Sequence, residues 1–356
     1  MNLDTPVMEV TIYKGNAEVI EVIRKDLCPW GTQGGSNIKR WLQSRRIPAS
    51  REHIDTLLDS SGLTLDELVQ KSLGLSLSDS YWLKPLYSGI TWAQVNFFEN
   101  DFTDDVGEFL MSGGVADELG DMYAPSNTTD GVMLKKWIIR NGTRYLVKRE
   151  EGLRYRHMNE VLAARIAKAL ELPHVPYFKL DNDTCMCPCM IKPGQHLVTA
   201  FQYMQQTGVI NKPRAEQYPA LCEAFGKSWL DGMLIFDYIV MNSDRHTKNF
   251  GFIQDAATMM VIEPFPIFDN GNSLFYDVNF GEDEPFNNLP CRSKPFVSSH
   301  DKQIQLVDLK PFQERLHSLE GIIHNLVSST FEGSRLRKEF IYSMGNLLQH
   351  RTRLLC

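Results

Sequence analysis

The sequence lacks several features that would place it in common classes of protein. It has no run of about eighteen apolar residues, so a transmembrane helix is not expected. Its start, MNLDTPVMEV, has neither the basic nor the apolar segment of a signal peptide. The formal net charge is −7 at pH 7, which argues against a globally basic nucleic-acid binder. We therefore expect a cytoplasmic protein without a membrane span.

Cysteine is sparse, with seven residues in a chain of 356. An odd number fits free thiols in a reducing compartment better than a disulfide framework. Cys185, Cys187 and Cys189 alternate along a strand-like segment, which would point all three sulfurs to one face. Structural zinc sites usually use C-x-x-C pairs with distant partners, so we interpret these cysteines as free thiols.

The most informative stretch runs from residue 235 to residue 271. A mostly apolar run, Trp229 to Met241, is broken only by Asp231, Gly232 and Asp237 and stops at N-S-D-R-H. Two short apolar runs follow, which predict a β-hairpin, and the next run ends in F-D-N-G. One carboxylate, Asp244, therefore precedes the hairpin, and another, Asp269, follows it.

These residue types are the ones that phosphoryl transfer requires. The reaction needs a carboxylate to orient the attacking hydroxyl and oxygen ligands to hold Mg²⁺ against the phosphates. Asp244 and Asn249 have the spacing of the kinase loop H-R-D-x-x-x-x-N, and Asp269-Asn270-Gly271 stands where D-F-G would. The alternative is structural, because Asp and Asn also favour caps and turns.

N-S-D-R-H-T-K-N followed by F-D-N-G resembles the HipA-like serine/threonine kinases, whose founder is the toxin of a persistence module. The catalytic loop is also similar to that of phosphatidylinositol kinases. The resemblance implies a two-lobed α+β kinase fold that uses ATP and Mg²⁺. It implies Asp244 as the catalytic base, Asn249 and Asp269 as Mg²⁺ ligands, and His246 close to the transferring phosphate.

A nucleotide-binding segment is predicted upstream. Small and hydroxyl residues precede a hairpin marked by Asn141-Gly142, at the position of a kinase's phosphate-covering loop, although the loop is neither a Walker sequence nor G-x-G-x-x-G. The residues predicted to cover the phosphates are Ser126, Asn127, Thr128, Thr129 and Gly131.

The hairpin and the helix after it supply two further residues. Lys148, at the end of the second strand, is the predicted phosphate-binding lysine, with Lys135 and Lys136 as rivals. Glu160 lies on an amphipathic helix predicted over residues 157–172, where it could pair with that lysine or remain a plain surface residue.

We divide the chain into an accessory α+β region (1–120), a nucleotide-binding lobe (121–195) and a mainly helical catalytic lobe (196–356). The accessory region carries a basic stretch from Lys39 to Arg51, which we interpret as a solvated helix face rather than a nucleic-acid site. In the catalytic lobe, residues 197–206, 218–225 and 229–241 are predicted helices, and residues 272–302 stand where an activation segment would lie.

The leading hypothesis is a HipA-like protein kinase that phosphorylates serine or threonine of a protein substrate and of itself. The resemblance adds a toxin–antitoxin role with an antitoxin-like partner protein. Two alternatives stay open, a lipid or small-molecule kinase of the same fold and a nucleotide-binding pseudokinase regulator.

Overall fold

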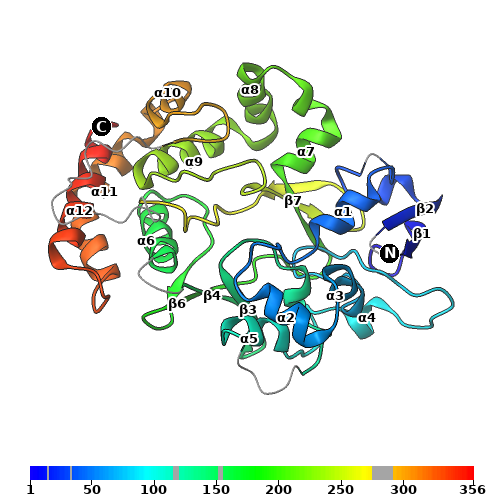
Figure 1. Cartoon of the computed structure of the whole chain (residues 1–356). Coiled ribbons are helices and arrows are strands. Elements are labelled where there is room, and N and C mark those ends of the chain that lie inside the picture. The colour runs from blue at the N-terminus through cyan, green and yellow to red at the C-terminus, as the bar shows by residue number, and fades with distance from the viewer. Residues whose placement is uncertain (14–15, 33, 115–119, 151–154, 275–291) are drawn as a thin grey trace. The chain divides into compact units, whose positions relative to one another are not determined.

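The computed structural model describes residues 1–356 except 14–15, 33, 115–119, 151–154 and 275–291 (Figure 1). The chain forms two compact units. The N-terminal unit contains Met1–Arg149, Pro188–Gly208 and Phe252–Glu263, and the C-terminal unit contains Glu150–Cys187, Val209–Gly251 and Pro264–Cys356. These units cross the boundaries predicted at residues 120 and 195, so the three-part division stays a prediction. Most of the predicted activation segment lies outside the described residues.

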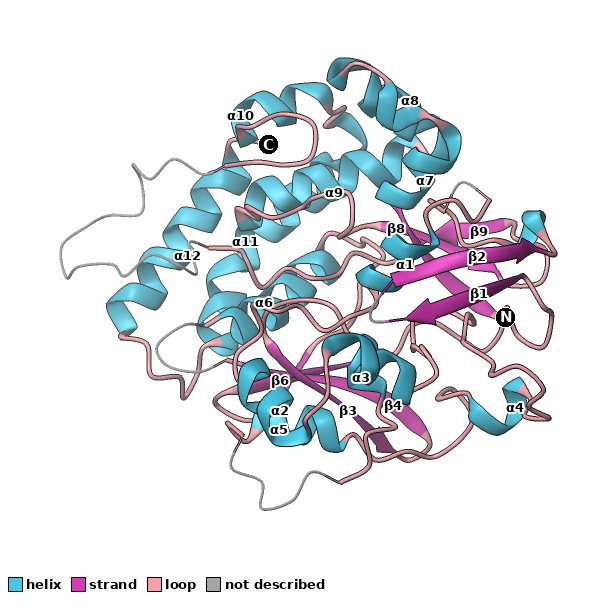
Figure 2. Cartoon of the chain, turned by 45° about the vertical axis from the view of Figure 1, so that its right-hand side comes forward, coloured by secondary structure: helices cyan, strands magenta, loops and turns pink. Residues whose placement is uncertain are grey.

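The N-terminal unit begins with the predicted hairpin. Strands β1 (Met8–Tyr13) and β2 (Asn16–Val22) pair antiparallel, with Met8 opposite Val22, and helix α1 (Ile38–Ser44) packs against β2 (Figure 2). Beneath the hairpin lies a small apolar core of Val7, Leu27, Cys28, Tyr81 and Met259. The elements that follow are η1 (Lys25–Leu27), α2 (Ile54–Ser61), α3 (Leu65–Lys71), α4 (Trp92–Val95), α5 (Asp105–Met111) and η2 (Pro125–Thr128).

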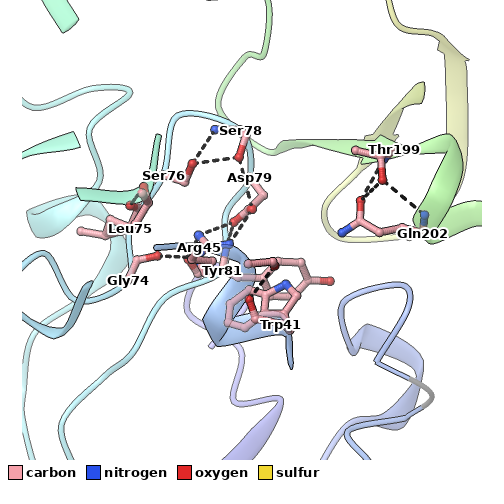
Figure 3. Close-up of polar contacts among 12 residues, drawn as sticks. Trp41, Arg45, Gly74, Leu75, Ser76, Ser78, Asp79, Tyr81, Thr199 and Gln202 are labelled. Atoms are coloured by element: carbon pink, nitrogen blue, oxygen red, sulfur yellow. Dashed lines mark hydrogen bonds and ion pairs between the residues drawn. The ribbon is translucent and has the colours of Figure 1, made fainter. Parts of the chain in front are cut away.

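The basic stretch is partly internal rather than a solvated face. Arg45 is buried, donates to both carboxylate oxygens of Asp79 at 2.8 and 3.0 Å and reaches the Gly74 carbonyl at 2.9 Å (Figure 3). Arg51 is also buried and donates to the carbonyl of Gly131. The predicted solvated face was wrong for these two cations, because each satisfies carbonyl groups of neighbouring loops.

Two further sets of strands complete this unit. Strands β3 (Leu134–Arg140) and β4 (Thr143–Arg149) form the predicted hairpin around Asn141-Gly142, with Leu134 opposite Arg149. Strands β7 (Gln195–Thr199), β8 (Gly251–Asp255) and β9 (Val261–Pro264) form a sheet in that order, and β8 and β9 are the second predicted hairpin.

The helix predicted over residues 197–206 begins later than expected. Residues 195–199 form β7, and α7 (Ala200–Thr207) starts after Thr199, whose side chain accepts from the Gln202 N–H while the Gln202 side chain accepts from Thr199 (Figure 3). This capping box satisfies backbone donors at the helix start, which places the boundary at Thr199.

The C-terminal unit is mainly helical. Its central helix, α9 (Lys227–Val240), is buried along most of its length, and α11 (Gln313–Thr330) packs against both α6 (Arg156–Ala169) and α12 (Lys338–Arg353). The remaining elements are β5 (Phe178–Lys179), β6 (Thr184–Pro188), which pairs antiparallel with β5, η3 (Val209–Asn211), α8 (Arg214–Phe225), α10 (His300–Gln303), η5 (Ile304–Leu306) and η6 (Lys310–Phe312).

None of the three clustered cysteines is in a disulfide bond. Cys185 and Cys187 are buried, and burial raises the pKa of Cys189 to about 11, which keeps that thiol protonated at neutral pH. Among the described residues, the one group of His, Cys, Asp and Glu side chains close enough to share an ion is His317, Glu320 and Cys356. No helix in the described part of the chain is long and apolar enough to cross a membrane.

Glycine 232 gives a first prediction. A Cβ at this position of α9 would lie 2.6 Å from Leu172 Cδ2 and 3.2 Å from Phe312 Cε1. We expect Gly232→Ala to destabilise the protein by about 1–3 kcal/mol, because overpacking a buried contact outweighs the gain in helix propensity. Chemical denaturation followed by circular dichroism measures the change.

Gly321 is the matched control for this substitution. It lies on the exposed side of α11, and nothing lies within 4 Å of a Cβ built there. We expect Gly321→Ala to stabilise the protein by about 0.5–1 kcal/mol. A stabilising Gly232→Ala would show that the α9 contact relaxes without cost.

A buried histidine predicts how stability depends on pH. Burial, followed by the positive charge of Arg351, lowers the pKa of His300 from 6.5 to about 3. Below pH 6.5 the unfolded chain takes up a proton that the folded chain does not, so stability falls as pH drops from about 6.5 towards 3 and is unaffected above.

The effect of His300 can be isolated by substitution. Between pH 7 and pH 5 its share of the loss is about 2 kcal/mol. We expect His300→Gln to lessen the difference in unfolding free energy between these two pH values by that amount. His317→Gln, at an exposed position of α11, should leave the difference unchanged. An equal pH dependence in His300→Gln and the wild type would contradict the assignment.

Candidate active site

The end of helix α9 creates the first loop of the site. Met241 takes a left-handed conformation (φ 53°), and its N–H donates to the Asp237 carbonyl, which ends the helix. Asn242 follows, fully buried, and its side-chain oxygen accepts from the Asp244 N–H at 2.9 Å. This Asx turn reverses the chain, so Asp244 leaves the buried helix for a partly exposed position.

A buried ion pair anchors this loop to the helix. Arg245 and Asp237 are both fully buried, and the guanidinium donates from Nε to Oδ2 and from Nη2 to Oδ1, each at 3.0 Å. Burial raises the pKa of Asp237 above its ordinary value, and the charge of Arg245 opposes that rise. The Asn242 side chain adds a donor at 3.2 Å to the same carboxylate.

The same guanidinium reaches a second loop. Its Nη1 donates to the carbonyls of Asn249 at 2.8 Å and Phe268 at 2.6 Å, and its Nη2 donates to the side-chain oxygen of Asn270. Arg245 therefore ties the loop of residues 242–249 to the loop of residues 268–272. Asp269 lies between two residues held in this way.

Helix α6 holds the second loop from the other side. The carboxylate of Glu160 accepts from the Asn270 N–H at 2.8 Å, and Asn159 donates to the carbonyls of Gly271 at 3.1 Å and Ser273 at 2.7 Å. Gly271 eases this approach, because a Cβ there would lie 3.3 Å from the Cβ of Arg156, which is closer than most Cβ contacts. Asp269 itself has a φ of 56°, a left-handed conformation that is uncommon for non-glycine residues and that Asp and Asn adopt more readily than most.

The Asp244 side chain is oriented at both of its oxygens. Oδ2 accepts from Asn272 Nδ2 at 3.0 Å, and Oδ1 accepts from Lys294 Nζ at 2.7 Å. The backbone and hydroxyl of Ser243 both donate to the Asn272 carbonyl at 3.1 Å, which keeps Asn272 beside the loop. With 31% of its side chain exposed, Asp244 is oriented and still accessible to an acceptor.

The remaining residues of the first loop are also fixed. Asn249 donates from Nδ2 to the Asp244 carbonyl at 3.0 Å, which leaves its Oδ1 as the end of the amide that can bind a cation. The Oδ1 of Asn249 and the Asp269 carboxylate are hard oxygen donors, the type that Mg²⁺ prefers, so these residues fit the implied ion. His246 is half-buried, and its Nδ1 accepts from the Lys248 N–H at 3.3 Å.

The predicted phosphate-covering residues lie in the N-terminal unit. Their side chains already have partners there: Ser126 donates to Asp104 at 2.6 Å, Asn127 to the Met122 carbonyl at 2.7 Å, Thr128 to the Leu75 carbonyl at 2.6 Å, and Thr129 to the Pro125 carbonyl at 3.1 Å. Gly131 has a φ of 93° and accepts from Arg51. The role of this segment towards phosphate stays a prediction.

Lys148 lies on β4 of the same unit, opposite Lys135, and is 2% exposed, so its side chain faces inward as its predicted role requires. Both rival lysines have polar partners close by. Lys135 donates to the Asp130 carbonyl at 2.8 Å, and Lys136 pairs with Glu108.

Some of the predicted site residues lie in the same compact unit. Asp244, His246, Asn249, Asp269 and Glu160 all belong to the C-terminal unit. Sequence reasoning missed Arg245 and Asp237 as the anchor, and Asn272 and Lys294 as partners of Asp244. The sequence did contain a sign of this ion pair. Asp237 interrupts an apolar run that is expected to be buried, and a buried carboxylate requires a cation beside it.

Two solved structures match this chain. One is HipA of Shewanella oneidensis MR-1, solved as a toxin–antitoxin system with HipB and operator DNA. The match covers 98% of this chain and 95% of the HipA chain, with 15% sequence identity and a TM-score of 0.55. CtkA, a Helicobacter pylori proinflammatory kinase, matches 62% of this chain and 90% of its own at 16% identity, with a TM-score of 0.43. No protein-family model and no curated protein matches the sequence. The HipA match confirms the predicted α+β HipA kinase fold.

The buried pair predicts a large loss of stability on substitution. Arg245→Met keeps the length of the side chain and removes the charge, which leaves Asp237 buried without its cation. We expect a loss of about 3–5 kcal/mol in unfolding free energy, measured by chemical denaturation.

The control for this prediction is an exposed ion pair in the same unit. Arg335 lies 3.4 Å from Asp183, and its side chain is 66% exposed. Arg335→Met should change the unfolding free energy by less than about 1 kcal/mol. Similar losses in both variants would mean that burial does not decide the cost of breaking the pair.

Proposed function

We propose that the protein is a cytoplasmic kinase that transfers the γ-phosphoryl group of ATP to a serine or threonine hydroxyl of a protein, with Mg²⁺ as its metal cofactor. One observation carries the proposal: a single buried guanidinium, Arg245, holds the loop that presents Asp244 and Asn249 and the loop that presents Asp269. The HipA fold supports the assignment. Phosphoryl transfer requires residues of these types.

The reaction transfers one group and one proton. The acceptor oxygen forms a bond to the γ-phosphorus, the bond from that phosphorus to the β–γ bridging oxygen breaks, and ADP leaves with the electron pair. The hydroxyl proton passes to the carboxylate of Asp244, which is held by Asn272 and Lys294 and is partly exposed to solvent.

A bound Mg²⁺ would supply positive charge that neutralises the phosphates. Asn249 and Asp269 would hold the ion, and their loops are fixed before it binds. Arg245 and Glu160 hold the backbone on either side of Asp269, so the point from which its side chain extends is supported from both sides.

The nucleotide assignments rest on the resemblance to HipA-like kinases. Lys148 would contact the nucleotide phosphates, and the segment from Ser126 to Gly131 would cover them. His246 would lie close to the transferring phosphate. Burial of Lys148 supports its assignment over Lys136, which is only partly buried, whereas Lys135 is also buried but donates to the Asp130 carbonyl. Glu160, proposed as the partner of that lysine, also supports the metal-binding loop through Asn270.

A protein acceptor and an antitoxin-like partner are part of the proposal. The HipA structure with a similar fold contains HipB, which supports a search for a partner protein. Direct use of the basic stretch for nucleic acid has no support, since Arg45 and Arg51 are buried and bind internal carbonyl groups.

Phosphate transfer from labelled Mg·ATP tests the function. The purified protein is incubated with and without a generic protein acceptor, and labelled residues are identified by phosphoamino-acid analysis. We expect labelled serine or threonine in the wild type. Asp244→Asn should lower the rate by about 10²–10⁴-fold, because the amide cannot take the proton. Asp269→Asn should lower it through weaker Mg²⁺ binding.

Asp301→Asn is the matched control, since Asp301 is an exposed carboxylate of the same unit and should leave the rate unchanged. Binding of Mg·ATP is followed in parallel by thermal shift. Binding without transfer to any acceptor would favour a pseudokinase, and the absence of binding would remove the kinase assignment.

A further inference from the structure

A lysine from a distant part of the chain contacts the proposed catalytic base. Lys294 lies 50 residues after Asp244, and its Nζ donates to Asp244 Oδ1 at 2.7 Å. The lysine side chain is 44% exposed and the carboxylate 31% exposed. Ion pairs between groups as exposed as these contribute little to stability. Stability therefore does not account for this contact.

The backbone that carries Lys294 is built to stay in place. The side chain of Gln303, which is 2% exposed, accepts from the N–H groups of Phe296 at 3.1 Å and Val297 at 3.2 Å and donates to the Lys294 carbonyl at 2.8 Å. One buried amide therefore satisfies three backbone groups of the loop. Such a network fixes the loop through its main chain.

Further contacts hold both ends and the apolar centre of the loop of residues 292–299. Ser293 N–H donates to the Ser298 carbonyl at 3.1 Å, and Arg214 of α8 donates to the Pro295 carbonyl at 2.8 Å. Phe296 is buried against Tyr218, with ring centroids 5.3 Å apart. Because the backbone of Lys294 is held in place, its ammonium group can reach only the space around this loop. Asp244 lies within that reach.

We propose that Lys294 is a positioning residue of the phosphotransfer reaction, which rests on the kinase function proposed above. Lys294 and Asn272 each take one oxygen of Asp244 and together fix the rotation of the carboxylate. Each carboxylate oxygen can accept more than one hydrogen bond, so the acceptor hydroxyl can still bind. The pair orients the base before the acceptor arrives.

Steady-state kinetics of substitutions at Lys294 test this role. Lys294→Met keeps the aliphatic stem and removes the donor, and we expect kcat to fall by about 10–100-fold because the base loses its orientation. The KM for ATP should stay within about twofold, since Lys294 acts on Asp244. Lys294→Arg keeps a cationic donor and should recover most of the wild-type kcat. Lys302→Met, at an exposed lysine of α10, should change neither constant.

A double variant separates positioning from a merely structural effect. If Lys294 acts through Asp244, Lys294→Met should cause no further loss of kcat in an Asp244→Asn protein. If the losses of kcat in the two single variants multiply in the double variant, the proposal is overturned. An unchanged kcat in Lys294→Met, or equal losses of kcat in Lys294→Arg and Lys294→Met, would also overturn it.

The contact can also be tested without measuring turnover. A carbodiimide links an amine directly to a carboxylate with which it forms an ion pair. Mass spectrometry of the wild type should find an amide between Lys294 and Asp244, and its absence would overturn the pairing even in an active enzyme. A wild type that transfers no phosphate removes the kinase function and the positioning role with it. An active wild type with an unaffected Lys294→Met variant removes the positioning role alone.

Discussion

The ion pair between Arg245 and Asp237 is the interaction on which the rest of the site depends. It lies in the interior, where an unpaired charge of either sign would be unfavourable, so each residue requires the other. The guanidinium has more donors than the carboxylate uses, and the surplus binds Asn249, Phe268 and Asn270. A bond needed to neutralise a buried charge thus also fixes the distance between two loops. A lysine has too few donors, and no fixed fork, to do the same.

Around this ion pair, the residues that hold the backbone are buried, and the residues that would contact ligands are partly exposed. Arg245, Glu160 and Asn270 are fully or almost fully buried, whereas Asp244, His246 and Asp269 are only partly covered. The buried residues define where the backbone lies, and the partly covered ones remain open to ligands. The left-handed conformation of Asp269 fits this arrangement, because backbone strain persists only where neighbours on both sides hold it.

Sequence reasoning predicted the elements whose signals are local. The hairpin at Asn141-Gly142 and the spacing of Asp244 and Asn249 depend on residues that are neighbours in the chain. It failed where distant segments meet: the contact from Lys294 to Asp244 has no local signature. The burial of Arg45 and Arg51 was missed for the same reason, since a charged helix face and a cation that binds loop carbonyls look alike in a sequence. The roles of the nucleotide-binding residues stay predictions.

The assembly of each compact unit from three stretches of chain has a consequence for biosynthesis. The N-terminal unit includes Met1–Arg149 but also Phe252–Glu263, which contributes most of β8 and β9 to the sheet with β7. A ribosome releases the first of these stretches long before the last, so this unit cannot close until residue 263 has emerged. The stretch Met1–Arg149, which is most of the unit, waits without β8 and β9 until then. Fragments that end near residue 120 or 195 would stop the chain in that waiting state.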